Sequence, residues 1–236
     1  MADEVLFDVD EHGVAIVSLN RPDKLNIFNL AMRDGLIAAV TAARDHPDVR
    51  ALLLRANGRH FSAGADLAEF ATADHIIEAR RIRWDRDPWG PLWDLPWPTV
   101  ASLHGYAVGS GLEMALLCDL RIAGPDTQIG LPETRLGMLP AAGGTQSLTR
   151  AIGAARALPF IATAQTIDAQ AALASGIIHQ VVDDAELSAA ACARRLAQLD
   201  PLVVTGARRA LHAAGDLPLG QGLELERRLA ARVYRR

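Results

Sequence analysis

The first two segments of the chain alternate apolar and polar residues with a period of two. Residues 5–9 form one alternating run and residues 14–18 form the next, with Glu-His-Gly at 11–13 between them. Alternation of this kind predicts half-buried β-strands, and the short polar segment predicts a turn between them. The Asn-Arg-Pro-Asp sequence at 20–23 then ends the second strand.

The middle of the chain repeats a rhythm of strands and helices. Apolar positions at helical spacing predict an amphipathic helix over 30–46, and short apolar runs predict buried strands over 49–55, 98–103 and 120–123. A second helix is predicted over 109–117. Strands that alternate with helices indicate an α/β fold.

The last third of the chain is predicted to be mostly helical. Helices are expected over 168–175, 184–199, 201–214 and from residue 219 onward, and one strand over 178–182 interrupts them. No low-complexity or Pro/Gly-rich linker divides the chain into independent domains.

Composition narrows the classes of function. Half of the 236 residues are apolar, which is enough for a sizeable core, and the net charge of −4 is spread along the chain. This charge provides no basic field, so no nucleic-acid partner is expected. The acidic N-terminus has no following apolar run, and no stretch approaches the ~18 apolar residues of a membrane span. We therefore expect a cytoplasmic protein with no signal peptide and no membrane partner.

Several polar and sulfur-containing residues are expected to be structural. Cys118 and Cys192 lie in apolar stretches and form no CxxC pair, which favours buried thiols in a reducing compartment. The histidines show no metal-ligand spacing, so no metal site is expected. His60 and His104, which flank two glycine turns, and Asp119 are each expected to have a structural role.

Two glycine-containing turns each follow a strand and precede a helix. They are Phe-Ser-Ala-Gly-Ala-Asp-Leu at 61–67 and Gly-Tyr-Ala-Val-Gly-Ser-Gly-Leu-Glu at 105–113. Small residues let the backbone approach a ligand closely, and amides at a helix N-terminus can bind an anion or a polarised carbonyl. Two such turns could supply two N–H groups to one oxygen, which is an oxyanion hole.

The same turns allow other interpretations. The glycines at 105, 109 and 111 do not match G-x-G-x-x-G, which disfavours a dinucleotide site. Ser110 is not the centre of a nucleophile elbow, because Val108 and Leu112 occupy the positions where G-x-S-x-G requires glycine. A purely structural role for both turns stays open at this point.

Two glutamates lie in apolar, glycine-rich surroundings. Glu113 falls in the first turn of a predicted helix, and Glu133 follows Pro132 and opens another short helix. A glutamate in a first helical turn often only complements the helix dipole. Two carboxylates beside an oxyanion hole could instead act as general acid and base.

Together, these residues resemble the enoyl-CoA hydratase/isomerase (crotonase) superfamily. The segments that carry the resemblance are FSAGADL at 61–67, GYAVGSGLEMALLCDLRIA at 105–123 and IGLPETRLGMLPAAGGTQSLTR at 129–150. The resemblance implies an α/β fold with a spiral core of ββα units over residues 1–185. It also implies a helical C-terminal part over 186–236 that assembles the chain into a homotrimer or homohexamer.

The resemblance also assigns roles to individual residues. In the superfamily, two backbone N–H groups bind the thioester oxygen, and by position these are the amides of Ala65 and Ser110. Glu113 and Glu133 match the two catalytic glutamates of the hydratases. Further matches along the substrate's coenzyme A are Lys24, Ala63, Gly64, Asp66, Leu67 and Gly109. No separate cofactor is implied, because coenzyme A is part of the substrate.

The resemblance favours hydration of a 2-enoyl-CoA. Polarisation of the thioester makes C3 electrophilic, water held by Glu113 and Glu133 adds there, and Glu133 is the expected proton donor to C2. The alternatives are a Δ3-Δ2 enoyl-CoA isomerase, another acyl-CoA lyase or hydrolase, and a non-catalytic acyl-CoA-binding member of the superfamily.

Two features depart from the usual pattern of the superfamily. The chain ends at residue 236, whereas members usually continue for about another helix that helps to cover the site. The tryptophans Trp84, Trp89, Trp93 and Trp97 gather in one short segment. They are expected either to pack in the core or to line an apolar acyl pocket.

Overall fold

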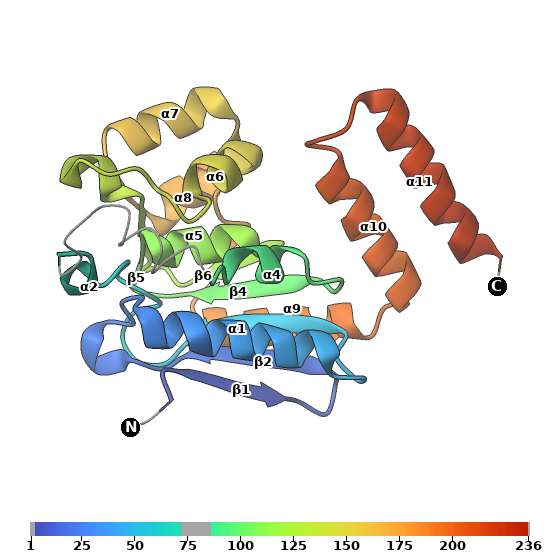
Figure 1. Cartoon of the computed structure of the whole chain (residues 1–236), viewed down its shortest axis with the longest axis horizontal. Coiled ribbons are helices and arrows are strands. Elements are labelled where there is room, and N and C mark those ends of the chain that lie inside the picture. Colours follow the sequence, from blue (N-terminus) through green and yellow to red (C-terminus); the bar gives the residue numbers. More distant parts are fainter. Residues whose placement is uncertain (1–2, 72–85, 236) are drawn as a thin grey trace.

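The computed structural model describes residues 3–71 and 86–235, and it is built on two β-sheets (Figure 1). The larger sheet has the order β1 (Val5–Val9), β2 (Val14–Leu19), β3 (Ala51–Ala56), β4 (Thr99–Leu103), β6 (Leu120–Ala123) and β9 (Gln180–Val181). Strands β1 and β2 pair antiparallel, and the other pairs in this sheet are parallel. The predicted α/β class is confirmed.

The smaller sheet lies beside the first and carries the turn that follows β4. Its order is β5 (Tyr106–Val108), β7 (Gln128–Gly130) and β8 (Thr166–Asp168). The helices are α1 (Leu30–Asp45), α2 (Leu67–Ala71), α4 (Trp89–Trp93), α5 (Ser110–Leu117), α6 (Gly144–Ile152), α7 (Ala154–Ala162), α8 (Ala169–Ser175), α9 (Ala185–Ala197), α10 (Pro201–Ala213) and α11 (Leu219–Tyr234). Two 3₁₀ helices, η1 (Pro22–Lys24) and η2 (Pro132–Leu136), complete the set in the described part of the chain.

Strand β3 shows how the two faces of the larger sheet are covered. Leu52 and Leu54 belong to the larger core cluster, which includes the buried apolar residues of α1. Ala51 and Leu53 point to the opposite face and pack with the buried alanines of α9. Because successive side chains of a strand alternate between faces, a strand such as β3, with four apolar residues in succession over 51–54, must be covered on both sides.

The element boundaries agree with the sequence patterns where those patterns are long. The helix predicted over 30–46 is α1, with Asn29 as its N-cap and a hydrogen bond from the Met32 amide to the Asn29 side chain. The strand predicted over 178–182 is limited to Gln180–Val181. The smaller sheet was not predicted, because its three-residue strands are too short to show a period.

Helices α10 and α11 form an antiparallel hairpin that extends away from the sheets (Figure 1). Neither helix contains a buried residue. Large apolar side chains that are exposed on the hairpin include Leu202, Val203, Leu211, Leu219 and Leu223.

The division of the chain into a spiral core over 1–185 and a helical part over 186–236 stays a prediction. In the part of the chain that the structure describes, no helix is both long and apolar enough to cross a membrane.

Candidate active site

The two glycine turns meet backbone to backbone. Gly64 has φ +101° and Gly109 has φ +55°, so both occupy a region that favours glycine. A Cβ added to Gly109 would lie 3.5 Å from the Gly64 Cα atom, and one added to Gly64 would lie 3.2 Å from the Val108 carbonyl oxygen. Glycine at both positions is therefore what allows the turns to come this close.

A short parallel bridge holds the turns in register. The Ser62 amide donates to the Tyr106 carbonyl at 2.8 Å, and the Val108 amide donates to the Ser62 carbonyl at 3.0 Å. The first turn of α5 also packs on this bridge, because a Cβ on Gly111 would lie 2.7 Å from the Ser62 Cβ atom. The turns are thus fixed to each other and to the start of α5.

The predicted oxyanion amides each follow one of these positive-φ glycines. Ala65 follows Gly64, and Ser110 follows Gly109 as the first residue of α5, where an amide has no partner within the helix. Within residues 3–71 and 86–235, neither the Ala65 nor the Ser110 amide donates a hydrogen bond. Ser110 is buried and Ala65 is half-buried. Such a pair of amides can bind one carbonyl oxygen in a site shielded from water.

Glu113 is buried one helical turn after the start of α5, with 1% of its surface exposed. Its Oε1 atom accepts hydrogen bonds from the amides of Ala142, at 2.9 Å, and Gly144, at 3.0 Å. Gly144 is the first residue of α6, so the carboxylate lies at the positive end of that helix. Amide donors and the helix dipole both stabilise a carboxylate anion at this position.

Glu133 reaches the same region from the 3₁₀ helix η2. Its Oε1 atom lies 3.0 Å from the position that a Cβ on Gly109 would take, and the residue is half-buried. The η2 backbone is fixed by an amide hydrogen bond from Met138 to the Glu133 carbonyl at 3.0 Å. The structure therefore brings Glu133 to the second glycine turn, and Glu113 lies on the helix that begins there.

The segment around Lys24 lies next to the first glycine turn. Lys24 is exposed at the end of η1, and the Ala63 amide donates to the Leu25 carbonyl at 3.0 Å. Leu67, at the start of α2, is 49% exposed. The predicted coenzyme A-binding residues therefore surround one surface formed by the η1 turn and residues 63–67.

Asp66 takes part in contacts within the protein. Its Oδ2 atom accepts from Arg21 Nη1 at 3.0 Å, and its Oδ1 atom accepts from the Ala68 amide at 3.2 Å at the start of α2. The carboxylate thus ties η1 to α2. A contact of Asp66 with coenzyme A stays a prediction.

Asn26 organises the site, although sequence reasoning missed it. Its side chain accepts from the Arg21 amide at 2.7 Å and donates to the carbonyls of Asn57 and His60, each at 2.8 Å. It is fully buried and has φ +51°, a conformation that asparagine tolerates better than most residues. The sequence gives no sign of this role, because Asn26 lies between Leu25 and Ile27 and two of its partners are more than 30 residues away.

The two flanking histidines make structural contacts. His104 Nε2 lies 3.0 Å from the Gly58 carbonyl oxygen, and His60 Nδ1 accepts from the Tyr106 amide at 3.1 Å. Burial lowers the pKa of His60, and nearby Arg59 lowers it further. These contacts fit the structural role predicted for both residues.

The tryptophans that the structure describes pack against the larger core cluster. Trp89, Trp93 and Trp97 are partly buried there, and the Trp89 ring lies 5.1 Å from the Phe28 ring, centroid to centroid. Trp84 lies outside the described residues.

In residues 3–71 and 86–235 no group of three or more His, Cys, Asp or Glu side chains could hold a metal ion.

Comparison with known proteins identifies the family to which the chain belongs. A family profile described as enoyl-CoA hydratase/isomerase matches residues 10–235. A probable enoyl-CoA hydratase, echA8, of Mycobacterium tuberculosis is 37% identical over 239 residues, covering 97% of this chain and 89% of the relative. The 2,3-dehydroadipyl-CoA hydratase of Escherichia coli is 36% identical over 221 residues, covering 93% and 86%.

Solved structures agree with these relatives. An enoyl-CoA hydratase subunit from Geobacillus kaustophilus superposes with a TM-score of 0.91 at 36% identity, covering 99% of this chain and 90% of that one. The enoyl-CoA hydratase from Bacillus anthracis gives a TM-score of 0.92 at 33% identity, covering 99% and 92%. The chain therefore belongs to the enoyl-CoA hydratase/isomerase family and has the crotonase fold.

Proposed function

We propose that this protein is an enoyl-CoA hydratase that adds water across the C2=C3 bond of a 2-enoyl-CoA. The observation that carries the proposal is the position of two glutamates at one glycine turn. The Glu133 carboxylate lies against Gly109, and the buried Glu113 lies on the helix that starts at the next residue. Two carboxyl groups placed together can act on one water molecule as general base and general acid, which is the help that hydration of a double bond uses.

The first step is polarisation of the thioester. The amides of Ala65 and Ser110 would bind the carbonyl oxygen, which draws electron density from C3 and stabilises the enolate that forms next. Both donors belong to a backbone that the bridge at Ser62 fixes before substrate binds. Removal of one such donor typically costs about 10²–10³ in rate.

The second step is the addition of water. Glu113 and Glu133 would hold the water, whose oxygen forms the new bond to C3. One water proton passes through the Glu133 carboxyl group to C2, and the enolate returns to the thioester. The two hydrogen bonds that Oε1 of Glu113 accepts hold that side chain in place while it orients the water.

The coenzyme A portion would lie along the surface formed by η1 and the first glycine turn. Lys24 is an exposed cation there and could approach a phosphate, and Leu67 offers an exposed apolar contact. Contacts are proposed for Lys24, Ala63, Gly64, Asp66, Leu67 and Gly109. The reaction needs no cofactor beyond the coenzyme A that the substrate itself carries.

The apolar hairpin of α10 and α11 supports assembly of several copies of the chain. Leu211 is 73% exposed and Leu219 is 78% exposed. Exposed leucines on unburied helices are typical of a surface that another protein covers. We propose a homotrimer or homohexamer that buries this hairpin.

A screen of thioesters tests the proposed reaction. A hydratase removes the conjugated absorbance of crotonyl-CoA with uptake of water. An isomerase would instead move the double bond of a 3-enoyl-CoA into conjugation, a hydrolase would release free coenzyme A, and a binding protein would turn over none of them. Loss of conjugation in crotonyl-CoA at no more than the uncatalysed rate would contradict the proposal.

A further inference from the structure

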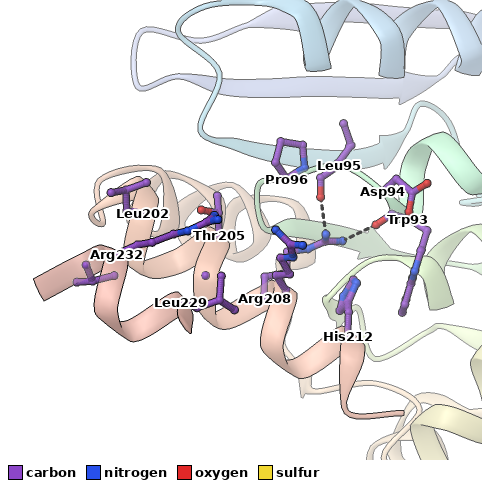
Figure 2. Close-up of a pocket in the computed structure, with 13 residues that line it drawn as sticks. Trp93, Asp94, Leu95, Pro96, Leu202, Thr205, Arg208, His212, Leu229 and Arg232 are labelled. Atoms are coloured by element: carbon purple, nitrogen blue, oxygen red, sulfur yellow. Dashed lines mark hydrogen bonds between the residues drawn. The ribbon is translucent and has the colours of Figure 1, made fainter. Parts of the chain in front are cut away.

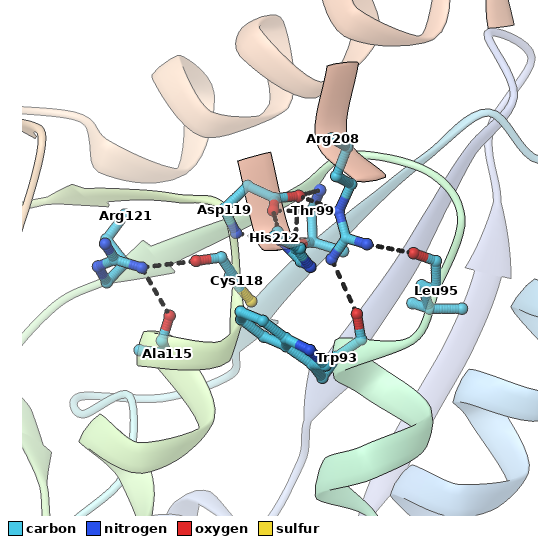
Figure 3. Close-up of polar contacts among 9 residues, drawn as sticks. All are labelled: Trp93, Leu95, Thr99, Ala115, Cys118, Asp119, Arg121, Arg208 and His212. Atoms are coloured by element: carbon cyan, nitrogen blue, oxygen red, sulfur yellow. Dashed lines mark hydrogen bonds and ion pairs between the residues drawn. The ribbon is translucent and has the colours of Figure 1, made fainter. Parts of the chain in front are cut away.

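A half-buried polar cluster lies at the end of α5 that is remote from Ser110 (Figure 3). Asp119 follows the residue that caps this end. Its carboxylate accepts from the amide and the hydroxyl of Thr99 at 2.8 and 3.0 Å, from Arg208 Nε at 2.8 Å, and contacts His212 Nε2 at 3.1 Å. Arg208 and His212 come from α10, so the cluster joins the hairpin to the core.

Arg208 reaches a second part of the core through the other nitrogens of its guanidinium group. One Nη atom donates to the Trp93 carbonyl at 3.1 Å and the other donates to the Leu95 carbonyl (Figures 2 and 3). The Arg208 side chain is only 10% exposed. A planar guanidinium can bind a carboxylate and two carbonyls at fixed angles, and a lysine ammonium on a flexible stem cannot reproduce that pattern.

His212 lies one helical turn after Arg208 and continues the same contact face. Its ring stacks on the Trp93 indole, with centroids 3.9 Å apart and planes inclined by 15°. Trp93 ends α4, and α4 packs against α5. Both core segments that Arg208 contacts therefore touch the helix that carries Ser110 and Glu113.

The remaining contacts between hairpin and core are looser. A cavity of about 550 Å³ separates the hairpin from residues 93–96 (Figure 2). Within the described ranges, the other ion pair from the hairpin to the body of the protein joins Asp216 to Arg150, whose side chains are 64% and 44% exposed. An exposed pair contributes little to stability. Within one chain, the position of the hairpin thus depends mainly on the cluster around Asp119.

We propose that Arg208 is a positioning residue for the reaction, since it fixes α5 through Asp119 and through the Trp93 segment. The inference rests on the proposed hydratase function. Helix α5 has 8 residues, all of them buried, so it can transmit a displacement from one end to the other. Its far end carries Ser110 and Glu113, and misplacement by about 1 Å at a reacting centre can cost about 10²-fold in rate.

The test compares Arg208→Met with Arg209→Met. Arg209 neighbours Arg208 and lines the same cavity, and within the described part of the chain it forms no hydrogen bond or ion pair. The probe is butyryl-CoA labelled with ¹³C at the carbonyl, which cannot be hydrated. Its carbonyl stretch, measured by difference infrared spectroscopy, reports how strongly the Ala65 and Ser110 amides polarise the bound thioester.

We expect Arg208→Met to move the bound carbonyl band back toward its value in free butyryl-CoA. The kcat for crotonyl-CoA should fall at least about tenfold, with a much smaller change in KM, because the amides bind the enolate oxygen more strongly than the thioester carbonyl and the transition state therefore loses more. Arg209→Met should match the parent in both measurements. If folded Arg208→Met kept both the carbonyl band position and the kcat of the parent, the proposal would be overturned. Arg208 would then have a stabilising role only.

A second variant covers the case in which Arg208→Met does not fold. Arg208→Lys keeps the charge beside Asp119 but cannot also bind both carbonyl oxygens, so a smaller band shift in the same direction is expected. A parental band and kcat in that variant would overturn the proposal. If the parent itself bound butyryl-CoA without a shifted carbonyl band, the proposed function would fail, and this inference with it.

Discussion

The Glu133 carboxylate occupies the space that a side chain on Gly109 would enter, since a Cβ on Gly109 would lie 3.0 Å from Glu133 Oε1. The glycine therefore does two things at once. It allows the turn before Ser110 to adopt φ +55° and ψ −126°, and it leaves the space in which the Glu133 carboxyl group lies.

Gly109→Ala should reduce hydration far more than it reduces stability. The alanine methyl would displace the Glu133 carboxylate, and the backbone would be strained by about 1–3 kcal/mol. We expect kcat for crotonyl-CoA to fall at least about 10²-fold. The control is Gly153→Ala, which also replaces a positive-φ glycine, with φ +78°, but at which a Cβ meets nothing within 4 Å. Equal losses of activity in both variants would refute the role assigned to this contact.

The contact of Asp119 with Arg208 and His212 on the hairpin should contribute less to the stability of the fold in acid. Burial raises the pKa of this carboxyl, but the hydrogen bond from His212 and the Arg208 charge outweigh that effect, so the pKa is lowered in the folded protein. A lowered pKa stabilises the fold above the unfolded-state value of about 4. The contribution is lost as the pH falls through the folded-state pKa.

Asp119→Asn should therefore destabilise the protein at pH 7 and progressively less in acid. Removal of one partner from a fully buried ion pair costs about 3–5 kcal/mol, and the cost here should be smaller because the Asp119 side chain is 23% exposed. The difference in unfolding free energy between parent and variant should narrow below about pH 4, as measured by urea unfolding. Asp216→Asn, at the exposed pair with Arg150, should have little effect at either pH. If Asp119→Asn lowered the unfolding free energy by the same amount at pH 7 and below about pH 4, this account would be excluded.

Assembly through the hairpin predicts the mass in solution. Light scattering should give about three or six times the 25.2 kDa of one chain. Leu211→Lys should lower this mass, whereas Leu187→Lys on α9, a comparably exposed position, should not; the two leucines are 73% and 67% exposed. A monomer at micromolar concentration in the parent, or no response to Leu211→Lys, would argue against the hairpin as the assembly surface.

The sequence predicted long elements well because their patterns repeat several times. Helix α1 spans 16 residues and its apolar positions recur at helical spacing, so its limits were predicted to within one residue. The three-residue strand β5 offers no repeat, and its pairing with β7 depends on residues distant in the sequence. Local patterns cannot encode such pairing.

The candidate site was predicted in part for a similar reason. Gly64 and Gly109 mark turns by their residue type, so both turns could be located before the fold was known. Asn26 donates a hydrogen bond to Asn57, which lies 31 residues away in the sequence. Arg208 donates one to Asp119, which lies 89 residues away. Nothing near either residue in the sequence signals those partners.

Glu113→Gln and Glu133→Gln test most directly whether the two glutamates act on one water molecule. Each variant keeps the size of the side chain and removes the carboxylate, which at Glu113 orients the water and at Glu133 transfers its proton. The rate of crotonyl-CoA hydration, followed by loss of the conjugated absorbance, should fall about 10²–10⁴-fold in each. The double variant should lose less than the product of the two, while butyryl-CoA binding stays close to that of the parent. Hydration by Glu113→Gln at close to the parent rate would contradict the two-carboxylate mechanism.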